Sequence, residues 1–207
     1  MLGQLTWHAL VGLVQVNKLS ISSRLPKSEG QFILTPSEYV YVVYMPIKIG
    51  DLCSVPDNLK WTEPLLEAVR EEDYRYRYWY LTVKYMHVSG YGNREGWHID
   101  GYLSEDINYL WSDIHPTLFA DQDFILSPSH TDSLQEMKDQ VLIPNVVEGK
   151  KNHLYRLDNT VVHAPQYCDP CFRAFVKISC SDSKYNLQGN ARNPAFNTNW
   201  DYVPRDD

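Results

Sequence analysis

The sequence lacks any apolar run that approaches the roughly 18 residues needed for a membrane-spanning helix. The segment from residue 1 to residue 16 is apolar in places, but it has no basic start and is interrupted by polar residues such as Gln4 and Gln15. These features are not those of a secretory signal peptide. We therefore expect neither a membrane protein nor a secreted one, and we predict a cytoplasmic location.

Cysteine is also scarce, with four residues, of which only Cys168 and Cys171 have a CxxC spacing. A structural zinc site needs more ligands than one such pair provides, and no second pair is present. Without a secretory signal, we expect reduced thiols. Because Asp169 and Pro170 are turn residues, the pattern predicts a hairpin turn. A redox pair or a partial metal site is the alternative.

Positive charge is in deficit, because 19 Lys and Arg residues face 26 Asp and Glu residues, for a net charge of −7. Bulk attraction to a phosphate backbone is therefore not expected, and there is no strong signal for duplex DNA. This balance favours a small molecule or a protein side chain as the substrate. The many Tyr and Trp residues would also suit stacking on a nucleobase, so that substrate stays open.

The composition favours strands and turns, with 15 Tyr, 6 Trp, 6 Phe and 12 Pro in 207 residues. We predict one domain (1–207) with a core at about 78–180, helix and strand support at 1–77, and a C-terminal wrapping tail at 181–207. We expect an antiparallel sandwich or barrel, mainly β with flanking helices. The expected strands are 39–45 (ended by Pro46), 78–88, 97–100, 109–111, 117–119, 124–126, 153–157, 160–163 and 172–180. The expected helical segments begin at Thr62, fading near Asp73, and at Ser133.

Two segments carry residues that suit metal chemistry. The first is Gly-Trp-His-Ile-Asp-Gly, with His98 and Asp100. Residues i and i+2 of a strand point to the same face, so both side chains can reach one metal ion while Ile99 packs behind them. The second is Val-Val-His-Ala-Pro, where His163 follows apolar residues and needs a partner once buried. Two imidazoles and one carboxylate form the facial triad of non-haem Fe(II) oxygenases.

An arginine follows ten residues after His163, in the sequence Phe-Arg-Ala-Phe-Val-Lys-Ile-Ser. Strand alternation places Arg173, Phe175 and Lys177 on one face. A buried guanidinium needs an anion, and its fork suits a carboxylate. The alternative interpretation is that Arg173 faces solvent beside Lys177.

The order HxD, several strands, a buried His and then Arg resembles the Fe(II)/2-oxoglutarate-dependent oxygenase superfamily, over residues 78–179. The resemblance implies a double-stranded β-helix (jelly-roll) core and Fe(II) on His98, Asp100 and His163. It also implies that Arg173 binds the C5 carboxylate of 2-oxoglutarate. The expected reaction uses O2 to hydroxylate an organic substrate and releases succinate and CO2. One departure is Phe175, where part of the superfamily has a serine.

Weaker candidates surround these residues. Lys84, Tyr109 and Thr117 are weak candidates for contact with the cosubstrate, and packing or solvent exposure is the simpler explanation for each of them. Asn93, Arg94 and Trp97 are candidates for substrate contact, and the loop before His98 could close over a substrate. Two other classes remain open for the whole chain. One is a non-catalytic jelly-roll binding or structural protein, and the other is a cupin-like zinc metalloprotein.

Overall fold

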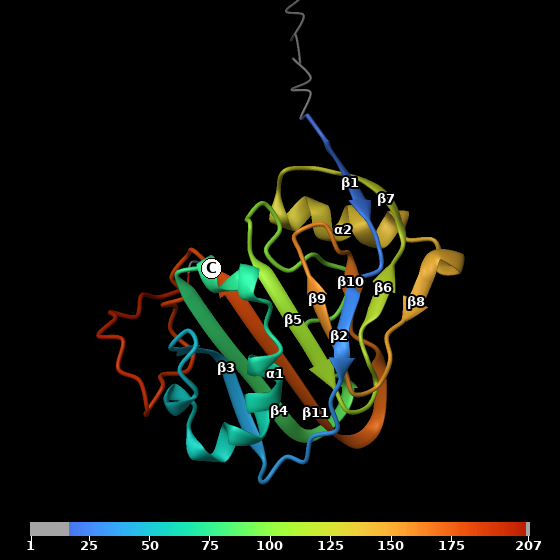
Figure 1. Cartoon of the computed structure of the whole chain (residues 1–207). Coiled ribbons are helices and arrows are strands. Elements are labelled where there is room, and N and C mark those ends of the chain that lie inside the picture. Colours follow the sequence, from blue (N-terminus) through green and yellow to red (C-terminus); the bar gives the residue numbers. More distant parts are fainter. Residues whose placement is uncertain (1–16, 206–207) are drawn as a thin grey trace, which may run out of the picture.

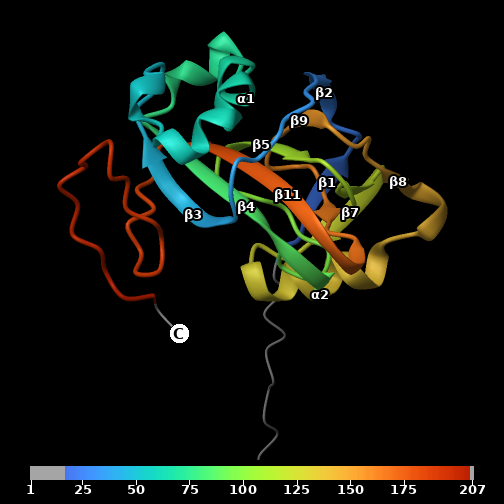
Figure 2. The same cartoon turned by 90° about the horizontal axis from the view of Figure 1, so that it is seen from below.

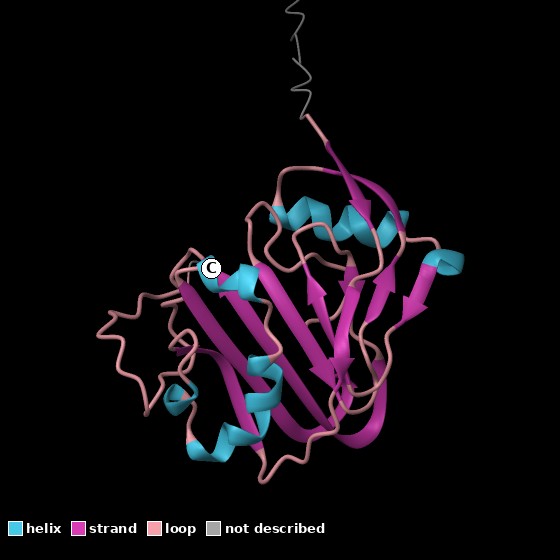
Figure 3. Cartoon of the chain, in the orientation of Figure 1, coloured by secondary structure: helices cyan, strands magenta, loops and turns pink. Residues whose placement is uncertain are grey.

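The structure is a computed structural model that describes residues 17–205. This part of the chain consists mainly of antiparallel sheets with few helices (Figures 1 and 3), which confirms the predicted mainly β class. Its strands are β1 (Leu19–Ser23), β2 (Lys27–Gln31), β3 (Val40–Ile47), β4 (Tyr78–Tyr91), β5 (Ile107–Ser112), β6 (Leu118–Ala120), β7 (Gln122–Leu126), β8 (Val146–Glu148), β9 (His153–Leu157), β10 (His163–Ala164) and β11 (Tyr167–Ser181). Its helices are η1 (Leu52–Ser54), η2 (Asp57–Thr62), α1 (Glu63–Glu67), η3 (Glu71–Arg75), α2 (His130–Gln140) and η4 (Ile143–Asn145).

The strands form one large sheet and two small ones. The large sheet has the order β2-β9-β5-β11-β4-β3, and the small ones are β10-β6-β8 and β1-β7. Strand β11 lies inside the large sheet, paired with β4 along almost its whole length and with β5 over its second half. Every described pairing between these strands is antiparallel. Across residues 17–205, no helix is both long and apolar enough to cross a membrane.

The pleat of β11 gives the large sheet two different faces. Its outer face carries Val176 and Ile178, which pack in one apolar cluster with Leu65 and Leu66 of α1. Figure 2 shows α1 and the neighbouring 3-10 segments on this side of the sheet. The inner face carries the other set of β11 side chains. There Phe175 packs with apolar residues between the large sheet and the β10-β6-β8 sheet, namely Leu110, Phe119, Leu157 and Val161.

Several predicted boundaries in the first half of the chain are wrong. Strand β3 continues through Pro46 to Ile47, because β3 is an edge strand and a residue without an amide hydrogen is tolerated there. Strand β4 extends to Tyr91 and so takes in part of the predicted loop at 89–96. The predicted helix ends at Glu67, and Asp73 lies in the separate 3-10 helix η3.

The predicted strands around the two histidines are also corrected. Residues 97–100 form only one isolated bridge, between His98 and His163, followed by a turn. Strand β10 spans His163–Ala164, so only His163 of the predicted strand 160–163 lies in a strand. The CxxC segment is not a hairpin turn, because Cys168 and Cys171 both lie within β11, on either side of an irregularity in its pairing with β4.

The segment after β11 packs beside β3 and the start of β4 (red in Figure 2). The amide of Ala191 donates to Val43 O at 2.8 Å, and Asn193 Nδ2 donates to Pro46 O at 2.8 Å. The Trp200 ring lies edge-on to Tyr78, with centroids 5.3 Å apart. These contacts give this segment fixed points along the edge of the sheet, although it contains no helix and no strand between 182 and 205.

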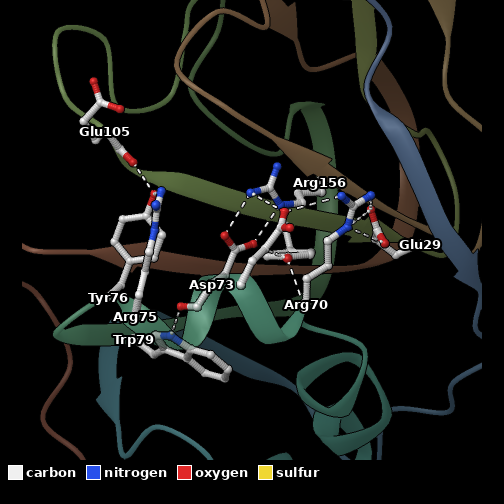
Figure 4. Close-up of polar contacts among 10 residues, drawn as sticks. Glu29, Arg70, Asp73, Arg75, Tyr76, Trp79, Glu105 and Arg156 are labelled. Carbon is white, nitrogen blue, oxygen red and sulfur yellow. Dashed lines mark hydrogen bonds and ion pairs between the residues drawn. The ribbon is translucent and has the colours of Figure 1, made fainter.

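A buried carboxylate ties the outer layer to the sheet (Figure 4). Asp73 accepts hydrogen bonds from Arg156 Nε at 2.7 Å, from Arg156 Nη2 at 2.9 Å and from the Tyr109 hydroxyl at 2.5 Å. Burial alone would raise the pKa of Asp73, but the hydrogen bonds from Arg156 and Tyr109 lower it below its usual value. Nearby, Arg70 contacts Glu29 of β2 at 2.6 Å. The network therefore joins η3 to β5 and β9.

Replacing Asp73 with alanine should lower the free energy of unfolding by about 3–5 kcal/mol, because Arg156 is then left as a largely buried charge without this partner. Urea denaturation measures this change. Glu72→Ala is the matched control: its carboxylate is exposed and lies 3.3 Å from Arg156, so its loss should cost less than about 1 kcal/mol. Equal effects of the two substitutions would contradict the role given to Asp73.

Candidate metal centre

A cavity of about 300 Å³ opens between the inner face of the large sheet and the segment that carries His98. The sheet contributes side chains from β3, β4, β5 and β11, and the opposite wall comes from loops, β10 and the start of α2. The lining residues are Val43, Tyr44, Thr82, Lys84, Asn93, Arg94, His98, Ile99, Asp100, Gly101, Leu110, Thr117, His130, His163, Pro165, Phe175 and Lys177. The cavity therefore combines three cationic side chains with one carboxylate and three imidazoles.

The two candidate histidine ligands are brought together by the backbone. The amide of His98 donates to His163 O at 2.9 Å, and the amide of His163 donates to His98 O at the same distance. Their rings lie on the same side of this bridge, with centroids 4.4 Å apart. On its other edge, His163 pairs with Phe119 of β6. The small sheet therefore fixes the position of both imidazoles.

Local backbone carbonyls orient the two rings. His98 Nδ1 lies 2.9 Å from Gly96 O, and His163 Nδ1 lies 3.0 Å from Val161 O. A carbonyl can only accept, so Nδ1 is the donating nitrogen in each ring, and Nε2 is the nitrogen that remains for another partner. Burial and the neighbouring His163 ring lower the pKa of His98 to about 4, so its imidazole is neutral at neutral pH. This is the arrangement that metal-bound histidines show, with the second nitrogen held by a backbone acceptor.

Asp100 reaches the same point from the turn after His98. Ile99 points away and packs into a separate apolar cluster with Val162. Gly101 has a φ of +71°, and a side chain there would meet Asp106 Cβ at 2.8 Å, so the turn requires glycine. As a result, one ligand atom each from His98, Asp100 and His163 lies within 4.8 Å of the others. Two imidazoles and a carboxylate, all facing a cavity, are a donor set that fits Fe(II).

Lys177 is the direct counter-charge of this carboxylate. Its Nζ lies 2.7 Å from Asp100 Oδ2, and both side chains are largely buried. Burial opposes the charged form of Asp100, but Lys177 and the neighbouring imidazoles hold the pKa of this carboxyl well below its usual range. Burial likewise opposes the charge on Lys177, while Asp100 and Tyr44 raise its pKa. Both the Asp100 carboxylate and the Lys177 ammonium are therefore charged.

Tyr44 completes this contact from β3. The irregularity between Val42 and Met45 gives Tyr44 a φ of +49°, a strained value for a bulky residue. The Thr82 hydroxyl accepts from the Tyr44 amide at 2.9 Å. The Tyr44 hydroxyl lies 3.3 Å from Lys177 Nζ, and the ammonium lies 5.3 Å from the ring centroid. The bulge thus brings Tyr44 into the cavity beside the lysine.

Four of the weaker sequence candidates also line the cavity: Lys84, Thr117, Asn93 and Arg94. Lys84 Nζ donates to Asn93 Oδ1 at 2.9 Å and to Gly92 O at 3.3 Å. Burial, together with Arg173 and Lys177, lowers the pKa of Lys84. Its contacts are neutral acceptors, so it is a buried cation available to an anionic ligand.

Arg173 lies on the inner face as the alternation predicts, and it is buried rather than exposed to solvent. Its Nε donates to Ile114 O and its Nη2 to His115 O, both at 3.1 Å. Arg173 is not among the residues that line the cavity. The sequence predicted a carboxylate as the partner of the Arg173 guanidinium. Backbone carbonyls instead accept part of its hydrogen bonds.

Two of the weaker candidates do not contact the cavity. Tyr109 points to the outer face of the sheet, where its ring is fully buried and its hydroxyl bonds to Asp73. The alternation of β5 sends Leu110 to the cavity instead. Trp97 packs against the apolar cluster that contains Ile99 and Val162. Neither side chain is in place to contact a ligand of this cavity.

The sequence did not identify Lys177 and Tyr44 as members of the site. Lys177 shares the face of Arg173 in an otherwise apolar strand, and this was the signal that could have identified it. Tyr44 could not be found in this way, because simple alternation does not locate the bulge that turns it inward. His130, at the start of α2, is exposed and also lines the cavity.

No protein-family model matches this chain, and no curated protein or solved structure matches it either. The chemistry of the site is therefore inferred from its own geometry.

Substituting Lys177 with methionine, which has similar length but no charge, should lower the free energy of unfolding by about 3 kcal/mol in metal-free buffer. Asp100 then loses its counter-charge inside the cavity. Added Mn(II) should restore more stability to the variant than to the wild type, because the cation replaces the lost charge. Thermal denaturation with chelator and with Mn(II) measures both effects.

The control for this experiment is Lys184→Met, because Lys184 is exposed. It should change neither the stability nor the response to Mn(II). A Lys177→Met protein that is destabilised but gains nothing more from Mn(II) than the wild type would argue against Asp100 as a metal ligand.

Proposed function

We propose that this chain is an Fe(II)- and 2-oxoglutarate-dependent dioxygenase that hydroxylates an organic substrate and releases succinate and CO2. The observation that carries the proposal is the convergence of His98, Asp100 and His163 on one point of a cavity. Two imidazoles and one carboxylate on one side of a metal leave positions open for a cosubstrate and O2. Bound iron and 2-oxoglutarate would supply the oxidation of a substrate C–H bond.

The order of the strands supports a double-stranded β-helix, the jelly-roll core of the proposed class. From β4 onward, the chain contributes β4, β5, β9 and β11 to the large sheet, in the spatial order β4-β11-β5-β9. Between them it contributes the His98 bridge, β6, β8 and β10 to the small sheet, in the order His98-β10-β6-β8. Eight such segments in two facing sheets of four are what a jelly roll requires.

The residues around the metal ligands have distinct roles in this proposal. His98, Asp100 and His163 would hold the iron, and the carbonyls behind the two imidazoles keep Nε2 free for it. Lys177 orients the carboxylate of Asp100 and neutralises the oxygen that faces it. The apolar residues Leu110 and Phe175 exclude water from the inner wall.

The far carboxylate of 2-oxoglutarate needs a cation deeper in the cavity. Lys84 is the lining cation whose described hydrogen-bond partners are all neutral, and Phe175 lies opposite it on β11. Arg173 is on the same face of β11, two residues before Phe175. We assign the direct contact to Lys84, and Arg173, the residue suggested by the sequence motif, supports the positive potential behind it.

The proposal as a whole is tested by anaerobic titration of the metal-free protein with Fe(II) and 2-oxoglutarate. The wild type should develop a weak metal-to-ligand charge-transfer band in the visible spectrum, and His163→Ala should not. His153→Ala is the control, since His153 lies on β9 and bonds to Ser28 outside the cavity. A protein that forms no band and instead retains zinc would support a zinc metalloprotein, and one that binds no metal would support a binding protein.

The assignment of the carboxylate contact predicts that Lys84→Met raises the 2-oxoglutarate concentration at half-saturation about 10- to 100-fold, the effect of losing a hydrogen bond to a charged group. The metal affinity should not change. The exposed Lys48→Met is the control. If Arg173→Met produces the larger increase while Lys84→Met has no effect, the direct contact belongs to Arg173.

A further inference from the structure

The Cys168–Cys171 segment is a β-bulge, and this brings its two cysteines onto one face of the sheet. Cys168 pairs with Gly90 of β4, and Cys171 pairs with Val88, while the two residues between the cysteines have no partner in this register. Val88 and Gly90 are two positions apart, so these two positions face the same side of the sheet. The two cysteines therefore follow each other along the sheet as neighbours i and i+2 would, although they are three apart in sequence.

This spacing suits a covalent bond between the thiols. Two positions of an antiparallel strand span about 6.5 Å, and the Cα atoms of disulfide-bonded cysteines lie about 4.4–6.8 Å apart. Burial raises the pKa of the Cys168 thiol, Arg173 opposes this, and Cys171 raises it further through its charge and a hydrogen bond. The two sulfur atoms and the guanidinium thus form one cluster.

The two thiols differ in their access to solvent. Cys168 is 1 % exposed, whereas Cys171 is partly exposed. A thiol that solvent reaches can react with an external disulfide, and a buried neighbour can then resolve the mixed disulfide. A metal site is the weaker interpretation, because the cluster offers two thiols beside the cation Arg173. Among the described residues, only His98, Asp100 and His163 bring three such ligand atoms within 4.8 Å of one another.

We propose that Cys168 and Cys171 are a reversible dithiol–disulfide site. Cys171, as its thiolate, attacks a small-molecule disulfide such as oxidised glutathione and releases one thiol. Cys168 then loses its proton to solvent and attacks the Cys171 sulfur, which releases the second thiol. Two protein thiols are oxidised to one disulfide, and one external disulfide is reduced to two thiols.

The position of this pair connects it to the cavity wall. The Gly92 backbone lies close enough to Cys168 to lower the pKa of its thiol, and Gly92 O accepts from Lys84 Nζ. Asn93 and Arg94, which follow in the same loop, line the cavity. The disulfide therefore forms directly against the loop that borders the candidate metal centre, although the proposal does not depend on the function of that centre.

The test is to incubate the reduced full-length protein with oxidised glutathione, block remaining thiols by alkylation and map the peptides by mass spectrometry without reduction. In the wild type, the peptide that contains Cys168 and Cys171 should be about 2 Da lighter than its reduced form, because the two thiols are linked. Dithiothreitol should reverse this disulfide. Cys53→Ser, at an exposed position, should behave like the wild type. Cys168→Ser should retain one glutathione on Cys171, since the resolving thiol is missing.

Recovery of the wild-type Cys168 and Cys171 as alkylated thiols would overturn the proposal. A stable glutathione adduct on Cys171 in the wild type, without the linked peptide, would also overturn it. Because both outcomes are read from the wild-type protein, the test does not depend on whether the variants fold.

Discussion

The structure depends on the position of β11 in the large sheet, between β4 and β5. Its alternate side chains divide between two environments: Val176 and Ile178 join the outer core, while Phe175 and Lys177 face the cavity. A slip of one residue in this pairing would exchange the two sets, burying the lysine under α1 and exposing apolar side chains in the cavity. The register of one strand therefore fixes both the core and the candidate metal centre.

The second constraint is charge inside the protein. A buried charge is costly unless it is paired, and this fold pairs the carboxylates of Asp73 and Asp100 with cations. On the outer side, Arg156 meets Asp73, and in the cavity Lys177 meets Asp100. In the first pair, the Asp73 carboxylate is fully buried between the outer layer and the sheet. The second pair faces a cavity beside two imidazoles, and for this reason we place the proposed metal centre there.

Much of this arrangement could be predicted from the sequence. The long aromatic run that became β4 and the apolar run that became β11 are strong strand signals, and the HxD spacing directs two side chains to one face. The boundaries failed where tertiary pairing overrides local preference. Pro46 continues a strand because that strand is at an edge, and Asp169 and Pro170 are accommodated as a bulge because β4 runs alongside. Similarly, the pleat of β5 turns Tyr109 toward the outer core. The composition of the strand does not reveal which of its alternate side chains face the outer core and which face the cavity.

The most direct test of the central claim is an anaerobic crystal structure of the protein with Mn(II), as a redox-stable substitute for Fe(II), and 2-oxoglutarate. The account predicts one ion bound by Nε2 of His98, Nε2 of His163 and the carboxylate of Asp100. 2-Oxoglutarate should chelate this ion and extend its far carboxylate toward Lys84. A structure in which Asp100 contacts only Lys177 and no ion lies between the two imidazoles would contradict the account.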